Sequence, residues 1–160
     1  MKVINNFLKN EEVFKDLQNM LLGDNFPYYY NNYTANSEDK SDYFFSHMLY
    51  NHDQQRSNYF NRILMPILGS LNFNYLYRAK VNCYTKKHKQ IKTGMHTDTA
   101  KQHTVALFSV NTNNGYTLFE NGEKVISVEN QLIIFDGSIK HCSVAQTDEN
   151  LRVNININVS

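Results

Sequence analysis

Three residues of the sequence have the types and the spacing of a metal-binding site. His96 and Asp98 are separated by one residue, and His141 follows 43 residues after Asp98. Residues two positions apart in an extended chain lie on one face, so His96 and Asp98 can bind one ion together while His141 reaches it from another strand. Two imidazoles and one carboxylate leave adjacent positions of the ion open, as in the facial triad of non-haem Fe(II) oxygenases. Because the chain has six His, ordinary hydrogen-bonded His residues without a metal are the alternative.

Four further residues could bind an organic acid beside such an ion, since a 2-oxo acid can chelate the open positions. Arg152 begins the predicted last strand, and its guanidinium could hold the distal carboxylate of 2-oxoglutarate by two parallel hydrogen bonds. Asn154 lies two residues further on and therefore shares a face with Arg152. Asn82 and Tyr84 also share a face and could bind the two ends of the acid. Taken singly, Arg152 could be a solvent-facing charge and Tyr84 an ordinary core aromatic.

The elements that position these residues change from helical to extended near residue 70. A helix is predicted over Glu11–Leu22, capped by Asn10 and ended by Gly23. Its apolar stripe is expected to comprise Val13, Leu17, Met20 and Leu21. A second helix is predicted over about Gln54–Leu68. The stretch Asp24–His52 shows no clear period, which indicates a loop with short strands.

From residue 76 the apolar residues recur with a period of two, which is typical of strands. Glycine-containing turns such as Asn113-Asn114-Gly115, Asn121-Gly122 and Asp136-Gly137 separate several of them. Eight strands are predicted, over about Leu76–Tyr84, Gly94–Asp98, Thr104–Val110, Tyr116–Phe119, Lys124–Ser127, Gln131–Phe135, Lys140–Val144 and Arg152–Val159. This pattern predicts a mainly β fold with N-terminal helices, in the form of a sandwich or jelly-roll barrel.

Length, charge and cysteine content narrow the class of protein. A chain of 160 residues fits one domain, with residues 1–70 as helical support and residues 71–160 as the β core. A net charge of +1 argues against nucleic-acid binding driven mainly by counterion release. No apolar run approaches the roughly 20 residues that span a bilayer, and residues 1–10 lack the layout of a signal peptide. Two cysteines indicate a reducing compartment, so the cytoplasm is expected. The 23 asparagines are explained by AT-rich codon usage.

The order of the motifs resembles the double-stranded β-helix domain, a cupin-like barrel, of the Fe(II)- and 2-oxoglutarate-dependent dioxygenases. That order is N-x-Y, H-x-D, H and R-x-N, and it extends over residues 80–160, about half of the chain. The segment 113–141, NNGYTLFENGEKVISVENQLIIFDGSIKH, is similar to small bacteriophage dioxygenases of the prolyl 4-hydroxylase-like type. If the chain is phage-encoded, the expected compartment is the host cytoplasm.

The resemblance implies a role for each of the seven residues. The metal ligands for Fe(II) would be His96, Asp98 and His141. Arg152 would bind the distal carboxylate of 2-oxoglutarate, and Tyr84 would hydrogen-bond the same end. Asn82 would contact the end that chelates iron, with Asn154 as a neighbour.

The same resemblance implies a reaction and its partners. The expected enzyme consumes O2, decarboxylates 2-oxoglutarate to succinate and hydroxylates a protein or peptide side chain, proline first, with ascorbate as a candidate reductant. The carboxylate ligand Asp98 favours hydroxylation, because halogenases of the superfamily lack it. Collagen-type prolyl hydroxylases generally have Lys where this chain has Arg152, so a prolyl substrate does not follow from the match.

Two other functions stay open at this point. A nucleic-acid base hydroxylase or demethylase is the first, although demethylases carry a second Arg six positions after the first, where this chain has Asn158. A catalytically silent jelly-roll binding module is the second. The basic segment Lys86–Lys92 is expected near the mouth of the pocket, either as a grip for an acidic peptide or phosphate backbone or as a solvated turn. Arg78 and Lys80 share the face of Asn82 and could extend a positive rim.

Overall fold

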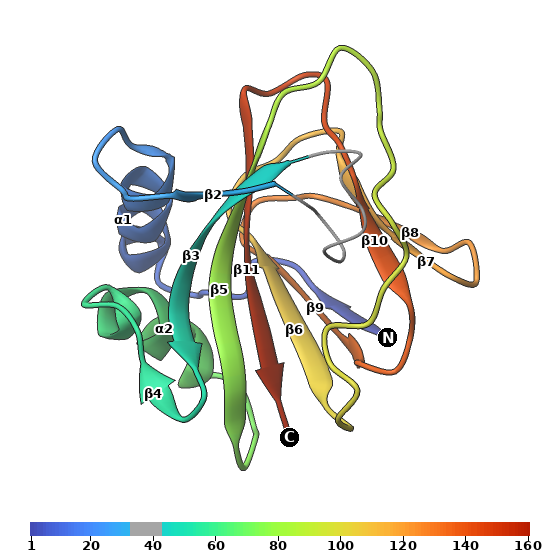
Figure 1. The fold of residues 1–160 in the computed structure, drawn as a ribbon. Coiled ribbons are helices and arrows are strands. Elements are labelled where there is room, and N and C mark those ends of the chain that lie inside the picture. The colour runs from blue at the N-terminus through green and yellow to red at the C-terminus, as the bar shows by residue number, and fades with distance from the viewer. Residues whose placement is uncertain (33–42) are drawn as a thin grey trace.

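Two β-sheets face each other in this computed structural model, which describes residues 1–32 and 43–160 (Figure 1). The elements are β1 (Lys2–Ile4), α1 (Glu11–Leu22), β2 (Tyr29–Asn31), β3 (Phe44–Asn51), β4 (Gln54–Gln55), α2 (Phe60–Leu68), β5 (Leu76–Thr85), β6 (Thr104–Ser109), β7 (Tyr116–Phe119), β8 (Lys124–Ile126), β9 (Gln131–Asp136), β10 (His141–Val144) and β11 (Leu151–Val159). The larger sheet has the order β1-β9-β6-β11-β5-β3-β2, with β4 paired to β3. The smaller sheet has the order β10-β7-β8. The predicted mainly β fold of jelly-roll type is confirmed.

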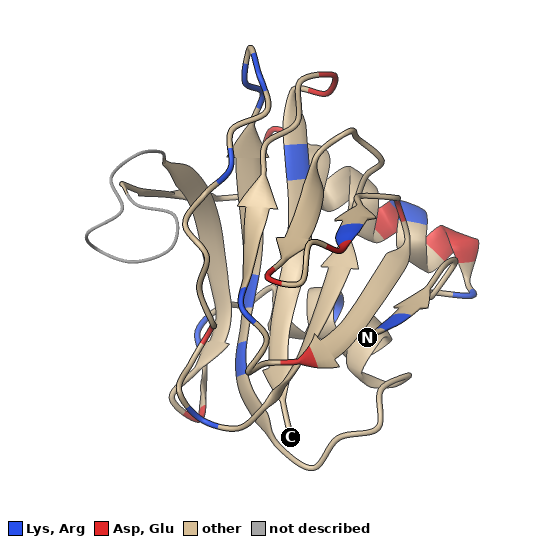
Figure 2. Ribbon diagram, turned by 90° about the vertical axis from the view of Figure 1, so that its right-hand side faces the viewer, with Lys and Arg blue, Asp and Glu red and all other residues tan. Residues whose placement is uncertain are grey.

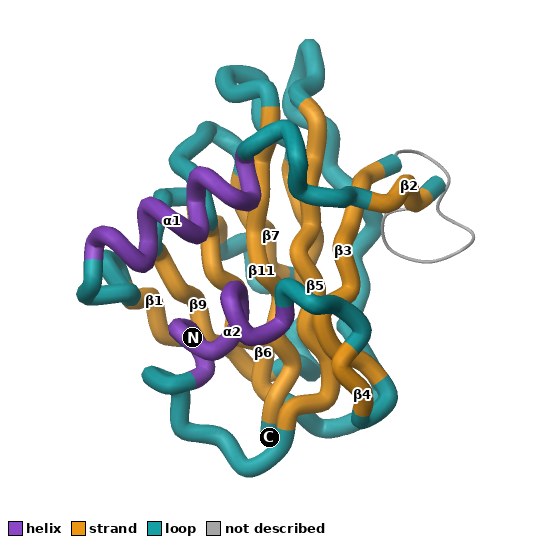
Figure 3. Tube along the Cα trace, turned by 90° about the vertical axis from the view of Figure 1, so that its left-hand side faces the viewer, coloured by secondary structure: helices purple, strands orange, loops and turns teal. Residues whose placement is uncertain are grey.

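Both helices cover the outer face of the larger sheet (Figure 3). They bury Phe14, Leu17 and Leu21 of α1 and Ile63, Leu64 and Ile67 of α2 against strand residues such as Val81 and Ile155. Burial of these apolar side chains is the main favourable term that holds the helices in place. The predicted stripe of α1 is right for its two leucines, whereas Phe14 is buried and Val13 and Met20 are only half-buried. No helix in the described part of the chain is long and apolar enough to cross a membrane.

The bounds predicted for the first helix are confirmed, whereas those predicted for the second are wrong at its start. The Asn10 side chain accepts hydrogen bonds from the backbone N–H groups of Glu12 and Val13, at 3.0 and 3.2 Å, and so caps α1. The second helix begins only at Phe60, because His52 and Asp53 adopt φ of 51° and 57° and turn the chain back as β4. This two-residue turn lacks the usual glycine, so the sequence gives no signal for it.

Residues 1–70, predicted as helical support with short strands over Asp24–His52, also contribute strands to the larger sheet. Strands β1 and β3 both belong to the larger sheet, and β3 pairs along most of its length with β5. The short strands predicted over residues 24–52 are present as β2 and β3, and β3 is longer than expected, with eight residues. The aromatic residues of β3 lie on both of its faces, toward the core and toward the pocket. The alternation of apolar and polar residues that marks a strand with one buried face is therefore missing from its sequence. The part of that prediction over residues 33–42 lies outside the described residues.

Seven of the eight strands predicted after residue 76 are confirmed, each within one residue of its expected bounds. The exception is 94–98, which forms no strand and is joined to the small sheet by an isolated bridge between His96 and His141. Strand β11 alternates as predicted: Val153, Ile155 and Ile157 belong to the core under the helices. Its asparagines face the smaller sheet and are buried as well, so both faces of this strand are covered.

Candidate metal centre

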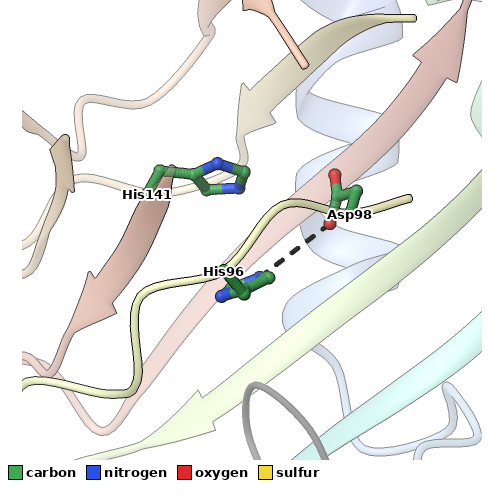
Figure 4. Close-up of side chains that lie close together, drawn as sticks. All are labelled: His96, Asp98 and His141. Atoms are coloured by element: carbon green, nitrogen blue, oxygen red, sulfur yellow. Dashed lines mark ion pairs between the residues drawn. The ribbon is translucent and has the colours of Figure 1, made fainter. Parts of the chain in front are cut away.

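The structure brings His96, Asp98 and His141 together between the two sheets (Figure 4). His96 and Asp98 come from the segment that connects β5 to β6, and His141 is the first residue of β10. One ligand atom from each residue lies within 4.8 Å of the others, and His96 Nε2 is 3.9 Å from Asp98 Oδ1. Among the described residues, this is the group of His, Cys, Asp or Glu side chains that could hold a metal ion.

Backbone contacts fix both imidazoles with the same nitrogen facing the centre. His96 and His141 exchange a pair of backbone hydrogen bonds, each 3.0 Å long. The Nδ1 atom of His96 lies 3.1 Å from the carbonyl of Gly94, and that of His141 lies 3.1 Å from the carbonyl of Ile139. Because a carbonyl can only accept, Nδ1 donates in each ring and Nε2 keeps its lone pair for a metal. The donor set therefore fits a divalent ion with nitrogen and oxygen ligands.

Three side chains hold the carboxylate of Asp98, which is 4% exposed. Asn156 and Asn158 each donate a hydrogen bond from Nδ2 to Asp98 Oδ2, at 3.0 and 2.9 Å. Arg78 Nη2 lies 2.9 Å from Asp98 Oδ1. One carboxylate oxygen is thus satisfied by two amides, and the other faces both His96 and Arg78. Strand alternation put both asparagines on the face of Asn154, so their role could have been inferred from the sequence, but it was missed.

The surroundings keep Asp98 ionised and His141 neutral. Burial alone would raise the pKa of Asp98, but Arg78, the amides of Asn158 and Asn156 and the nearby His141 together hold that pKa well below its ordinary value. Burial lowers the pKa of His141, against the opposing effects of its bond to Ile139 and of Asp98. Both groups are therefore in the protonation state that binds a metal at neutral pH.

Removing one of the amide donors should weaken metal binding without removing a ligand. We expect Asn158→Ala to reduce the affinity for Zn(II) by about 10-fold, because Asp98 loses a bond that orients it. Calorimetric titration measures this, with Asn72→Ala, an exposed asparagine outside the site, as the matched control. Equal affinities in the two variants would contradict the orienting role.

The lowered pKa of Asp98 also makes the free energy of unfolding depend on pH. The unfolded chain takes up this proton near the ordinary value of 3.8, whereas the folded chain stays ionised to lower pH. The free energy of unfolding contributed by Asp98 is therefore present at neutral pH and lost as the pH falls below about 4. We expect urea unfolding at pH 5, 4 and 3 to show a shallower loss of stability in Asp98→Asn than in the wild type. If the free energy of unfolding fell equally in wild type and in Asp98→Asn between pH 5 and pH 3, the contribution of Asp98 would be excluded.

Arg152 is a buried cation at the far end of the same pocket. It is 2% exposed, and no Asp or Glu pairs with it in residues 1–32 and 43–160. Its Nε donates to Ser127 Oγ at 2.8 Å, its Nη1 donates to Ser143 Oγ, and its guanidinium lies 5.5 Å from the ring centroid of Tyr84. A buried, unpaired guanidinium is costly unless a ligand brings an anion to it. The site thus fits a carboxylate at this end.

A glycine makes room for this arginine. A Cβ at Gly115 would lie 2.9 Å from Arg152 Cδ and 2.8 Å from Asn113 Oδ1, closer than side chains normally approach. The Asn-Asn-Gly turn found in the sequence therefore also shapes the pocket. The two serines that position Arg152 gave no sequence signal, because Ser is a common turn residue and neither lies in one of the motifs.

The remaining predicted residues line the same pocket between the metal centre and Arg152. Asn82, Tyr84, Arg152 and Asn154 all contribute to its lining, together with the three candidate metal ligands. Asn82 Nδ2 donates to Asn154 Oδ1 at 2.9 Å, and Asn82 Oδ1 is buried without a hydrogen-bond partner. Tyr84 stacks on Phe44 and has a side-chain hydrogen bond with Ser143. All seven predicted site residues therefore face one pocket, and Asn82 has an acceptor left for a ligand.

The basic segment Lys86–Lys92 is not part of the pocket lining, although Tyr84 before it and Thr93 after it both are. It follows β5 at the end of the barrel marked by the blue loop tip in Figure 2. Lys86 donates to the backbone carbonyl of Asp148, and Lys87 lies over the ring of Tyr43. None of its residues lines the metal pocket. The cations that reach this pocket are Arg152 and Lys80, with Arg78 against Asp98.

Comparison with known proteins identifies the fold through structure alone. No protein-family model and no curated protein matches the sequence. A prolyl hydroxylase from Trichoplax adhaerens, solved with a hypoxia-inducible-factor peptide fragment, matches with a TM-score of 0.66 at 14% identity, covering 99% of this chain and 82% of that one. An α-ketoglutarate-dependent non-haem epimerase from nogalamycin biosynthesis matches with a TM-score of 0.68 at 12% identity, covering 99% and 76%.

A third structure names the wider family. An oxidoreductase of the 2OG-Fe(II) oxygenase family from Burkholderia pseudomallei matches with a TM-score of 0.61 at 14% identity, covering 91% of this chain and 76% of that one. The hydroxylase and the epimerase catalyse different reactions, so the shared architecture does not by itself select a reaction. The protein has the fold of the 2-oxoglutarate- and Fe(II)-dependent oxygenases.

Proposed function

We propose that the protein is an Fe(II)- and 2-oxoglutarate-dependent dioxygenase that hydroxylates a protein or peptide side chain. The observation that carries this proposal is one pocket with two ends: a His96–Asp98–His141 cluster and a buried, unpaired Arg152. A 2-oxo acid needs both, because one end chelates a metal and the other carries a carboxylate. The overall reaction converts 2-oxoglutarate, O2 and R–H into succinate, CO2 and R–OH.

Each residue of the pocket has a task in this proposal. His96 Nε2, His141 Nε2 and the Asp98 carboxylate would hold Fe(II), which supplies the activation of O2 when bound. Arg152 would bind the distal carboxylate of 2-oxoglutarate, helped by Tyr84 and Ser143. Asn82 would contact the chelating end, and Asn154 would hold Asn82 in place.

The protein's own work is to orient the co-substrate and to exclude water. The lining of the pocket includes buried side chains, among them Arg152, Thr117 and Cys142. A co-substrate held at both ends has few orientations left, so its reacting carbon is kept beside the metal. The carboxylate ligand Asp98 supports hydroxylation as the outcome.

A peptide is the first substrate class to test, with proline as the first target residue. The Trichoplax adhaerens neighbour was solved with a peptide fragment, which supports this choice. Nucleic acid is the alternative, and the placement of Asn158 disfavours it, since this residue holds Asp98 where demethylases carry an Arg. The buried free cysteines Cys83 and Cys142 are consistent with a reducing compartment, which we propose is the cytoplasm.

The proposal is tested by anaerobic loading with Fe(II) followed by 2-oxoglutarate, ascorbate and O2. Wild type should form succinate, and His96→Ala should not, because the variant lacks a metal ligand. His88→Ala is the matched control, since His88 is exposed and outside the site. Equal succinate formation by wild type and His96→Ala, with no binding of 2-oxoglutarate by calorimetry, would contradict the proposed enzyme. The protein would then be a jelly-roll binding module without catalytic activity. A screen of peptides against oligonucleotides then decides the substrate class.

A further inference from the structure

A second, larger cavity adjoins the metal centre on the side away from Arg152. It is an open cleft of about 810 Å³, and its lining includes Tyr75, Tyr77, Arg78, Asp98 and Lys101. Among the described residues, Asp98 lines both this cleft and the metal pocket. A molecule in the cleft therefore lies next to the reacting centre, opposite the end that would hold 2-oxoglutarate.

Two cations on β5 face this junction. Arg78 pairs with Asp98 at 2.9 Å, but its Nε is buried without a hydrogen-bond partner. Lys80, two residues further on, lines the metal pocket and has its ammonium 5.3 Å from the ring centroid of Phe44. In residues 1–32 and 43–160, Lys80 has neither a hydrogen bond nor an ion pair. Burial and, to a smaller extent, Arg78 lower the pKa of Lys80 to about 8, against the opposing effect of Asp98.

Loading of the site engages the carboxylate of Asp98, which otherwise pairs with Arg78. In the proposed function, the charges of Fe(II) and Arg152 together offset those of Asp98 and the dicarboxylate. Arg78, which lines the cleft, and Lys80, which lines the adjoining metal pocket, are then left without compensation. The other acidic residue in the described lining of the cleft, Asp53, is engaged by the hydroxyl of Tyr75. Cations held in a partly buried site favour a ligand that carries an anion.

From this placement we propose that Arg78 and Lys80 bind an acidic side chain of the peptide substrate, next to the residue that is hydroxylated. This inference rests on the proposed function and deepens it. Tyr75 and Tyr77, whose ring centroids are 4.9 Å apart, provide an aromatic wall for the peptide chain. A carboxylate on a flexible side chain can reach the recessed guanidinium of Arg78, which is 23% exposed. The backbone phosphates of a nucleic acid are not carried on a flexible side chain and so fit the recessed guanidinium less well.

The test measures peptide binding without turnover. Wild type is loaded with Zn(II) and 2-oxoglutarate and titrated with three capped, fluorescent heptapeptides that have a central proline flanked by Glu, Gln or Lys. We expect the Glu peptide to bind about 10-fold more tightly than the Gln peptide, and the Lys peptide to bind most weakly. A phosphodiester oligonucleotide of equal length is titrated in parallel.

Variants then assign the preference to a residue. Lys80→Gln should lose the preference for Glu over Gln, and Lys80→Arg should keep most of it. Lys89→Gln removes an equal charge from the exposed basic segment and should keep all of it. Thermal melting of each variant establishes that it is folded.

Each contrary outcome overturns a different statement. Equal affinity for the three peptides, in wild type that binds Zn(II) and 2-oxoglutarate, overturns this inference and leaves the proposed function intact. Tightest binding of the oligonucleotide overturns the peptide class. A preference for Glu that survives in Lys80→Gln overturns the assignment of Lys80. Failure of wild type to bind Zn(II) and 2-oxoglutarate overturns the proposed function itself.

Discussion

Asp98→Asn is expected to weaken metal binding by more than about 100-fold and to abolish succinate formation. The substitution keeps the shape of the side chain but removes the negative charge that the site supplies to the ion. It also turns an amide toward Asn156 and Asn158, which both donate to this position, and toward the guanidinium of Arg78. The oriented, ionised ligand is therefore lost in two ways, by charge and by hydrogen bonding. Calorimetric titration with Zn(II) and the succinate assay measure the effect.

The matched control for this variant is Asp24→Asn, which neutralises an exposed carboxylate far from the pocket. Because Asp98→Asn leaves Arg78 without its partner, the variant is also expected to melt at a lower temperature. Binding is therefore measured well below the melting temperatures of both proteins. Wild-type Zn(II) affinity in Asp98→Asn would show that Asp98 is not a ligand.

Arg152→Met should separate co-substrate binding from fold stability. We expect the affinity for 2-oxoglutarate to fall by about 100-fold or more, because the carboxylate loses a buried, charge-assisted contact. In the ligand-free protein the same change should raise the melting temperature, because it removes a buried charge that no Asp or Glu of the described residues compensates. Calorimetry and thermal melting without ligand measure the two effects.

Without ligand, Arg152→Met is expected to melt at a higher temperature than wild type. After addition of 2-oxoglutarate and Zn(II), wild type should melt at the higher temperature. The wild type gains stability from a ligand that binds only the folded chain, and Arg152→Met does not. Lys89→Met replaces an exposed cation in the same way and should leave the affinity for 2-oxoglutarate and the melting temperature as they are in wild type. If Arg152→Met kept the wild-type affinity for 2-oxoglutarate, the distal carboxylate of 2-oxoglutarate would have to bind elsewhere than at Arg152.

Much of the β core could be predicted because its strands have two different faces. In β11 the apolar and polar residues alternate without a break, so both the strand and the common face of Arg152 and Asn154 follow from the sequence. Glycine turns marked the ends of neighbouring strands. The helix α1 was equally clear, because Asn10 and Gly23 bound it on both sides.

The errors arose where tertiary contacts replace local signals. The turn at His52 and Asp53 reaches left-handed φ without glycine, and β3 is covered on both faces, so neither has a distinctive pattern. The segment around His96 is held by single bridges to the small sheet rather than by a strand ladder. The three partners of Asp98 come from β5 and β11, which are far apart in the sequence but paired in the sheet, and only the assembled fold brings them to one carboxylate.

The position of Asp98 in the wall between the two cavities implies thermodynamic linkage. The same carboxylate faces the candidate metal ligands on one side and Arg78 at the cleft on the other. An ion that draws charge from Asp98 must change how tightly the cleft holds an anion. Reciprocity then requires the anion to change the affinity for the ion by the same factor. The two sites should therefore fill cooperatively, through a single side chain and without any movement of the sheets.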